Sequence, residues 1–561
     1  MERIGSFVKG LWRPKVSYWL LLLCVVPPIV ETAIVLLLIP GSAPTLAPQA
    51  SAVAPFGVFH DLRWLSVYAN SWLTFGLLAG ATLVVRGVLT ALSVRLAWPA
   101  TTSPPAVGKL MLRGVGSTTF AAVLLAPSVA LLFALAVVPV SWLFLAGAPL
   151  ALGIAVVVHP IAISGGWWKR AIPLRAIGWV AMSFFVMTVA AGVVAWVPHW
   201  VDFVVDVVVG VFNARAWVGM VGAVVEPRHV RGLVPAVPAA LAVMVAIVAL
   251  GSVNGFTHVN PRNPGGVSEA FTSVAARGER AVLVVAGYGS HWNGKEKHPV
   301  PGSFFEVQFS YSGLGPSGQP LPYTSAETVK PLKVLDAEMA QQVAKLHEES
   351  GDRVDIVAES EGALVAATYL VSFRHAPVST VVLASPLIDP GRVSYPVRSS
   401  SVGFGVASRY AMHLLGSAYQ SVAPIDLNPE SAFLESVNRL APLLQQVIAC
   451  PVAGVRKFAF LPLADATAAP VHITLPFHSV VVSAFHGGLV GSPPTDRLIA
   501  QVLEDKTPAG SGVLHDLDTV IAASSAAWQV PSLALSSYSR VIPAHQTLVS
   551  TCNALAEALK S

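Results

Sequence analysis

Long apolar stretches occupy most of the first 255 residues of the chain, and shorter apolar runs follow them. A helix needs about 20 apolar residues to cross the hydrocarbon core of a bilayer. Stretches near this length lie at 16–39, 71–85 with some flank, 118–138, 141–158, 176–197, 201–225 and 233–253. The pattern therefore predicts an all-α transmembrane domain over residues 1–255, with about seven spans.

The pattern changes near residue 280, where short apolar runs alternate with amphipathic stretches. Runs typical of buried strands lie at 281–286, 304–309, 354–357, 380–384 and 455–463. Residues 324–350 and 363–373 show the helical period, with Leu335, Met339 and Val343 on one face of the first. This alternation predicts a mostly parallel, doubly wound sheet covered by helices.

The domain boundaries follow from these patterns. We expect a linker at 256–279, a second domain at 280–508 and a C-terminal tail at 509–561, to which the sequence assigns no function. A long insert at about 387–450 separates two of the strand runs.

The composition supports a membrane protein. Of the 561 residues, 54% are hydrophobic and 12% are charged, whereas soluble domains carry about 25% charged residues. Residues 1–255 hold 15 Lys and Arg against 6 Asp and Glu, and the remainder holds 20 against 24. The basic excess belongs to the membrane loops, and no basic stripe with interleaved aromatic residues accompanies it, so we expect no nucleic-acid partner.

Positive charges predict the orientation of the spans. With a cytoplasmic N-terminus and a signal anchor as the first span, the Lys- and Arg-rich loops lie inside, and seven spans place the second domain outside. The stretch 201–225 is the uncertain span, because it contains Asp202, Asp206 and Arg215. If it lies in the interface instead, the second domain is cytoplasmic.

Ionisable residues within spans are functional candidates by default, and Glu31, Asp202 and Asp206 are of this kind. The alternative for the two aspartates is pairing with Arg215 or an interfacial position. Three cysteines are too few for a zinc site or a disulfide framework. Cys450 and Cys552 could pair if their domain is extracytoplasmic; the alternative is two unrelated buried thiols.

The segment Val357–Ala363 places Ser360 among small residues, directly after an apolar run and before a helical stretch. A strand, a sharp turn and a helix form the layout of a nucleophile elbow, in which a strained serine needs small neighbours. Ser360 is therefore the candidate nucleophile, and an ordinary turn serine is the alternative.

These segments together resemble the α/β-hydrolase superfamily, particularly its lipase/esterase-like members and PGAP-type lipid hydrolases, here fused to an N-terminal polytopic membrane domain. Four matches within about residues 280–505 carry the resemblance: the glycine turn 287–289, the strand end 309–315 (similar to F-x-Y-x-G), the elbow, and 426–434 (similar to D-L-x-P-x-S-x-F-L). Ala358 and Ala286 depart from residues common in the family. The resemblance implies a helical lid at 387–450 over an acyl pocket, and no metal or cofactor.

The family's chain order is serine, acid, histidine. Asp465 follows the strand run 455–463, and His486 lies about twenty residues later in a glycine-rich loop before a final helix at 496–503. We therefore predict Ser360 as nucleophile, His486 as general acid and base, and Asp465 as the orienting acid.

Other residues are alternatives for these roles. Asp389 is an alternative acid, and His472 or His478 is an alternative base; for both histidines the structural interpretation is simpler. Asp426 is interpreted as a capping or lid residue.

The resemblance implies an oxyanion hole formed by the backbone N–H groups of Tyr288 and Glu361. Glu359 and Glu361 place carboxyl groups on both sides of Ser360. Their charges would disfavour anionic substrates or raise the pKa of His486, which is a hypothesis from the sequence alone.

The sequence thus predicts a multi-pass membrane protein with an extracytoplasmic serine hydrolase that cleaves lipid or acyl esters, with membrane lipids as partners. A triad-dependent acyltransferase is one alternative. A transporter or sensor whose hydrolase-like domain binds ligand without turnover is another.

Overall fold

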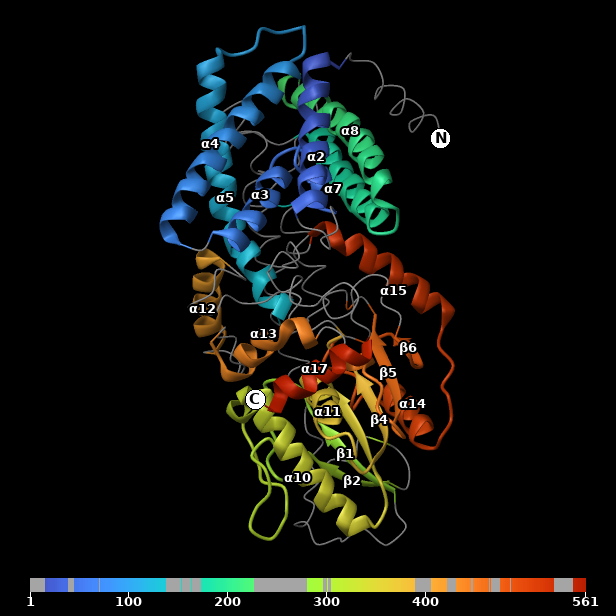
Figure 1. The fold of residues 1–561 in the computed structure, drawn as a ribbon. Coiled ribbons are helices and arrows are strands. Elements are labelled where there is room, and N and C mark those ends of the chain that lie inside the picture. The colour runs from blue at the N-terminus through green and yellow to red at the C-terminus, as the bar shows by residue number, and fades with distance from the viewer. Residues whose placement is uncertain are drawn as a thin grey trace.

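The computed structural model describes residues 16–38, 45–69, 71–137, 173–226, 280–295, 304–388, 405–420, 430–444, 447–463, 475–484, 486–528 and 548–560, and the single residues 153, 163, 300 and 465. The molecule has a helical half, formed by the N-terminal residues, and a sheet half (Figure 1). The predicted span 233–253 and the linker 256–279 lie outside the described residues, as does nearly all of the predicted span 141–158.

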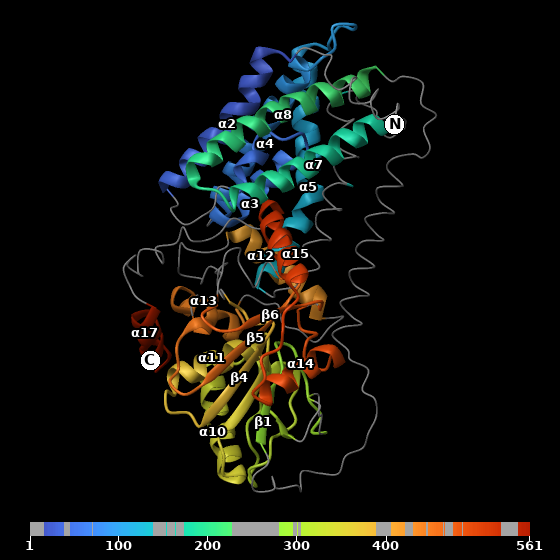
Figure 2. The same ribbon diagram turned by 90° about the vertical axis from the view of Figure 1, so that its right-hand side faces the viewer.

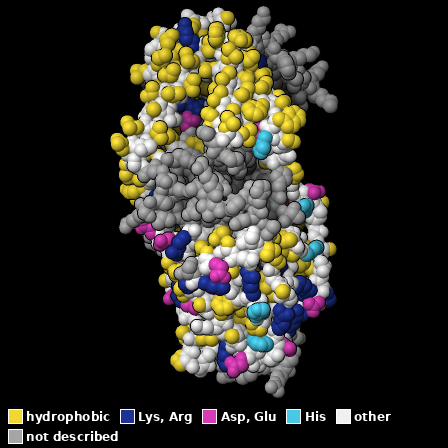
Figure 3. Space-filling model, in the orientation of Figure 1, with side chains coloured by type: hydrophobic (Ala, Val, Ile, Leu, Met, Phe, Trp, Pro, Cys, Tyr) yellow, Lys and Arg dark blue, Asp and Glu magenta, His cyan; other side chains and the backbone are white. Residues whose placement is uncertain are grey.

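The described helices of the helical half are α2 (Tyr18–Leu38), α3 (Phe56–Tyr68), α4 (Trp72–Leu96), α5 (Val107–Val137), α7 (Leu174–Val194) and α8 (His199–Val225). Within the described residues, α2, α4, α5, α7 and α8 are long and apolar enough to cross a membrane. Hydrophobic side chains cover this half, whereas charged side chains gather over the sheet half (Figure 3). The predicted all-helical membrane domain agrees with these features.

Two polar positions explain where the spans differ from the sequence pattern. The apolar stretch 71–85 ends before Arg86, yet α4 continues to Leu96. Arg86 finds its partner in α3, where its Nε and Nη2 donate to Asp61 at 2.7 and 2.5 Å. In α8 the buried Asp206 accepts a 2.5 Å hydrogen bond from Thr32 of α2. The uncertain stretch 201–225 thus lies within the 27-residue helix α8, in which Asp202, Asp206 and Asn213 are buried.

The sheet half contains one six-stranded sheet in the order β2-β1-β3-β4-β5-β6, and every described pair is parallel. The strands are β1 (Arg280–Val285), β2 (Phe304–Gln308), β3 (Val354–Glu359), β4 (Val378–Ala384), β5 (Arg456–Pro462) and β6 (Ser479–Val482). Parallel sheets are covered on both faces, which explains the nearly continuous Val, Ile, Leu and Ala runs of β1, β3 and β4. The strand β6 has only four residues and is not among the strands that the sequence predicts.

Helices cover both faces of this sheet. One core packs α10 (Leu332–Ser350), α11 (Glu361–Ser372) and α17 (Leu548–Lys560) against Leu283, Ile356 and their neighbours. The second core packs α14 (Pro493–Leu503) against the alternate strand residues, among them Val284 and Val357. The predicted doubly wound arrangement is therefore present.

Segments of the sheet half lie between it and the helical half (Figures 1 and 2). They are α12 (Val406–Gln420) and α13 (Ala432–Leu444) of the insert, and α15 (Gly512–Ser525) with the short 3-10 helix η5 (Ala526–Trp528). The Trp528 ring stacks on Phe184 of α7, with centroids 4.6 Å apart, and its Nε1 donates to Thr188 at 3.0 Å. The predicted tail thus docks the two halves together.

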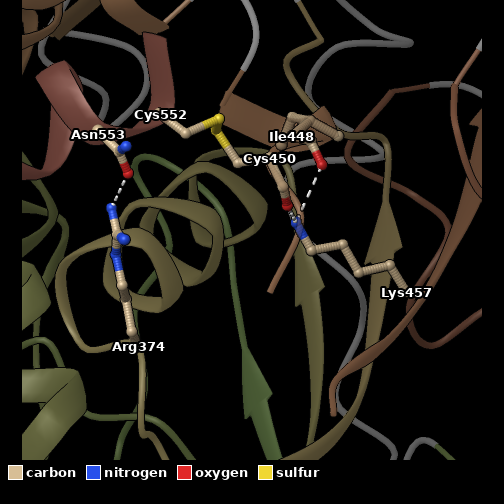
Figure 4. The surroundings of a disulfide bond; sticks show 6 residues. All are labelled: Arg374, Ile448, Cys450, Lys457, Cys552 and Asn553. Carbon is tan, nitrogen blue, oxygen red and sulfur yellow. Dashed lines mark hydrogen bonds between the residues drawn. A yellow bond between two sulfur atoms is a disulfide. The ribbon is translucent and has the colours of Figure 1, made fainter. Parts of the chain in front are cut away.

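A disulfide joins Cys450 and Cys552 across 102 residues of sequence (Figure 4). Cys450 follows the 3-10 helix η4 (Val447–Ala449), and Cys552 lies in α17, which packs against α11 and α13. Nearby, Lys457 donates to the carbonyl oxygens of Ile448 and Cys450 at 3.1 and 2.6 Å. The bond therefore fastens the C-terminal helix to the sheet half.

We predict that replacing both bridged cysteines (Cys450→Ser with Cys552→Ser) lowers the free energy of unfolding by about 2–5 kcal/mol, because the cross-link restricts the unfolded chain. The measurement is thermal unfolding of the purified protein in detergent. A reductant should destabilise the wild type and leave the double variant unchanged. A wild type whose stability does not respond to reductant would contradict this role.

Candidate active site

The turn between β3 and α11 presents Ser360. Its φ of 56° and ψ of −115° lie outside the regions that a non-glycine residue ordinarily adopts. Small neighbours permit this conformation: a Cβ on Gly362 would approach Ala286 O to 2.7 Å, and one on Gly287 would approach Ser360 Cβ to 3.0 Å. The predicted nucleophile elbow is thus present in its geometry.

Ser360, His486 and Asp465 form one hydrogen-bonded chain. Ser360 Oγ lies 2.8 Å from His486 Nε2, and His486 Nδ1 lies 2.6 Å from Asp465 Oδ2. Asp465 is 3% exposed, so its carboxylate interacts with the imidazole and not with solvent. The structure therefore brings together the three residues that the sequence places 126 and 21 positions apart.

This arrangement can activate the serine. With its proton on Nδ1, His486 donates to Asp465 and leaves Nε2 to accept the hydroxyl proton of Ser360. Deprotonation makes Ser360 Oγ a nucleophile toward an acyl carbon.

The alternative residues have other positions. His478 lies 3.2 Å, through Nε2, from the carbonyl oxygen of Pro508 and packs on Phe458 with centroids 4.9 Å apart, which are structural contacts. Asp389, His472 and Asp426 lie outside the described residues.

The two predicted oxyanion donors border the serine. Glu361 is the first residue of α11, and the first N–H groups of a helix have no acceptor within it. Tyr288 follows Gly287, which packs against Ser360 Cβ. Both residues thus lie next to Ser360, where the sequence predicts the oxyanion donors.

Glu359 has a role that the sequence analysis missed. Its buried carboxyl oxygen Oε1 accepts the backbone N–H groups of Leu489 and Val490 at 2.7 and 3.4 Å. Burial raises the pKa of this carboxyl group, while the two N–H donors and His486 oppose the increase. Because Leu489 and Val490 follow His486 in one loop, Glu359 connects the nucleophile turn to the histidine loop.

Asp496 holds the far end of the same loop. Its Oδ1 accepts the N–H of Gly491 at 2.9 Å, and burial raises its pKa to about 6. Two acidic side chains therefore fix the loop that carries His486.

Glu361 differs from Glu359. Its side chain is buried at 1% exposure, and in the described part of the chain neither carboxyl oxygen has a hydrogen-bond partner. Burial raises its pKa well above the usual range, and the nearby Tyr311 hydroxyl, which donates to Ala286 O at 2.6 Å, opposes this increase. Burial therefore favours the neutral form of the Glu361 carboxyl group. The hypothesis of a negative charge on both sides of Ser360 stays a prediction.

No family model matches this chain, and no curated protein matches it in sequence. Among solved structures, the chain is similar to the crystal structure of Aspergillus fumigatus lipase B, with 14% identity and a TM-score of 0.24. The match covers 71% of this chain and 96% of that chain. A likeness of this size carries no argument about the present fold or function.

We predict that Glu359→Leu lowers the kcat for a soluble 4-nitrophenyl ester at least about tenfold. The buried N–H of Leu489 and the partly buried N–H of Val490 lose their acceptor, at a cost of about 1–3 kcal/mol for a buried group. Glu359→Gln is the matched control: its side-chain oxygen can still accept both bonds, so most of the activity should remain. Equal losses in both variants would contradict a positioning role.

We also predict that Glu361→Gln leaves the pH dependence of kcat/KM unchanged. Because burial favours the neutral carboxyl group at Glu361, we expect an amide in its place to remove no charge that acts on His486. The measurement is a pH–rate profile between pH 5 and 9 beside the wild type. A shift of the acidic limb would show that Glu361 is ionised.

Proposed function

We propose that this protein is a membrane-bound serine hydrolase that cleaves carboxylic esters, with lipid or acyl esters as its substrates. The observation that carries the proposal is the hydrogen-bonded chain from Ser360 through His486 to Asp465, on a strained turn after a parallel strand. A turn serine without catalytic function needs neither the strain nor the paired histidine.

The proposed reaction follows from the geometry. Ser360 Oγ attacks the ester carbonyl carbon while its proton passes to His486 Nε2, and Asp465 stabilises the resulting imidazolium. The N–H groups of Tyr288 and Glu361 stabilise the oxyanion. The C–O bond to the alcohol breaks as His486 returns the proton to the leaving oxygen, and water then releases the acyl group by the same steps in reverse.

The α/β-hydrolase assignment and the lid belong to this proposal. Helices on both faces of a parallel sheet and a nucleophile elbow after β3 support the assignment. The insert helix α13 begins beside the predicted oxyanion loop, where the ring centroids of Phe433 and Tyr288 are 5.5 Å apart. This contact supports the proposal that the insert forms a lid beside an acyl pocket.

Two observations support an extracytoplasmic sheet half. The helix α8 has the length and apolar composition of a span. Together with the four other described spans and the predicted spans 141–158 and 233–253, it gives seven, an odd number that puts the sheet half opposite a cytoplasmic N-terminus. The Cys450–Cys552 disulfide is typical of proteins outside the reducing cytoplasm. An ester carried by lipid would then lie within reach of the anchored enzyme.

We expect Ser360→Ala to lower ester turnover at least about 10³-fold and His486→Ala to do the same, because the two groups act as a unit. His478→Ala is the matched control and should retain activity. The measurement is steady-state hydrolysis of a series of 4-nitrophenyl esters. Unchanged turnover in Ser360→Ala would favour a domain that binds ligand without catalysis.

Product analysis with an added alcohol separates hydrolysis from acyl transfer. The proposed hydrolase releases free acid whether the alcohol is present or absent. A new ester as the main product would identify an acyltransferase that uses the same residues.

A further inference from the structure

The two halves are joined through α3, a helix of the helical half too short to span a membrane. At its C-terminal end, Ser66 O and Ala69 O accept the backbone N–H groups of Gly405 and Val406, both at 2.8 Å. A Cβ on Gly405 would approach Ser66 O to 2.5 Å, so the insert meets α3 backbone to backbone. The start of α12 is therefore fixed to the helical half.

The second connection uses the middle of α3. The fully buried Arg63 donates from Nη1 to the carbonyl oxygen of Ala527 at 2.9 Å, and Gln49 Nε2 donates to the same oxygen at 2.5 Å. The insert and the C-terminal segment thus both bind one helix. We conclude that α12 has a defined position relative to the spans.

Exposed aromatic side chains mark the two ends of the spans. Tyr18 and Trp19 begin α2 and are 65% and 66% exposed. Trp196 follows α7, and Trp200 is the second residue of α8; they are 50% and 70% exposed. The second pair lies on the side of the sheet half, because a Cβ on Gly192 of α7 would be 3.6 Å from Ser524 N of α15.

Trp72 begins α4 on this same side, next to α12. Its ring and that of Tyr410 in α12 pack edge to face with centroids 5.7 Å apart, and the two side chains are 54% and 55% exposed. Leu414, one turn further along α12, is also 55% exposed, and Leu73 of α4 is 75% exposed. The exposed apolar surface of a spanning helix thus continues onto the insert.

Tyrosine and tryptophan concentrate where the hydrocarbon of a bilayer meets its head groups. We propose that the bilayer interface passes through the junction of the two halves, that α12 lies in it through Tyr410 and Leu414, and that the substrate is an ester held in that leaflet. This inference rests on the proposed function for its substrate and on the junction geometry for its lipid contact.

The edge of the sheet that carries Ser360 faces the junction of the two halves. Ser360 follows the carboxyl end of β3, and the insert that contacts the predicted oxyanion loop lies between the sheet and the helical half (Figures 1 and 2). Tyr288 is 3.4 Å, hydroxyl to hydroxyl, from Ser431, just before α13. An amphiphile beside α12 would thus lie on the side of the sheet half that carries Ser360.

Lipid contact is tested without activity. Tyr410→Cys and Leu414→Cys, labelled with an environment-sensitive fluorophore and reconstituted in phosphatidylcholine vesicles, should be quenched by brominated acyl chains. The matched control is Phe373→Cys: Phe373 is 41% exposed but lies at the far end of α11 from Ser360. Quenching at neither position of α12, or equal quenching at Phe373, would overturn the proposal, and mutual quenching between labels at 410 would identify a second copy as the occupant.

Substrate delivery is tested with two esters. Tyr410→Asp and Leu414→Asp should lower the turnover of vesicle-embedded 4-methylumbelliferyl oleate at least about tenfold relative to water-soluble 4-methylumbelliferyl acetate, with Phe373→Asp as control. Equal turnover ratios in all variants would overturn delivery from the leaflet and leave the hydrolase standing. If the wild type cleaves neither ester, the proposed function fails, and the quenching result still decides the lipid contact. If an aspartate variant loses activity toward both esters, the quenching result at the same position decides whether that residue contacts lipid.

Discussion

The backbone conformation of Ser360 is the constraint on which the rest of the site depends. A positive φ at a residue with a side chain costs about 1–3 kcal/mol and persists only where the surroundings impose it. Here Gly287 and Gly362 permit the close approach of the end of β1 and the turn at Ser360. The buried strand β3 ends at Glu359 and so fixes the residue directly before Ser360. The strain places the hydroxyl at the edge of the sheet, where a loop from a distant part of the chain brings His486 to it.

Several buried polar groups in the helical half find a hydrogen-bond or ion-pair partner in another segment. An unpaired charge in an apolar environment is expensive, so buried arginines and acids are found with each other or with carbonyl groups. Arg86 pairs with Asp61, while Arg63 binds a carbonyl group of the C-terminal segment. Because His60 also contacts Glu31 of α2 at 2.7 Å, one short helix connects two spans to the sheet half. The helical half therefore packs directly against the sheet half and does not only tether it through the chain.

Much of the site could be predicted from the sequence, because the parallel alternation of strands and helices brings the ends of β3 and β5 to one edge of the sheet. The chain order of Ser360, Asp465 and His486 then indicated which side chains meet at that edge. The extension of α4 beyond Arg86 could not be predicted, since its partner lies in another helix. The function of Glu359 in holding the histidine loop was equally hidden, because a charge next to a serine suggests electrostatics before it suggests a backbone contact 130 residues away. Asp389 and the seventh span stay predictions.

The central claim is that Ser360 is an activated nucleophile. Its most direct test is to treat the wild-type protein in detergent with a fluorophosphonate, which forms a covalent bond only with an activated hydroxyl, and to identify the modified peptide by mass spectrometry. The account predicts one stoichiometric adduct on Ser360, lost in His486→Ala. Absence of any adduct, or an adduct on a different serine, would contradict it.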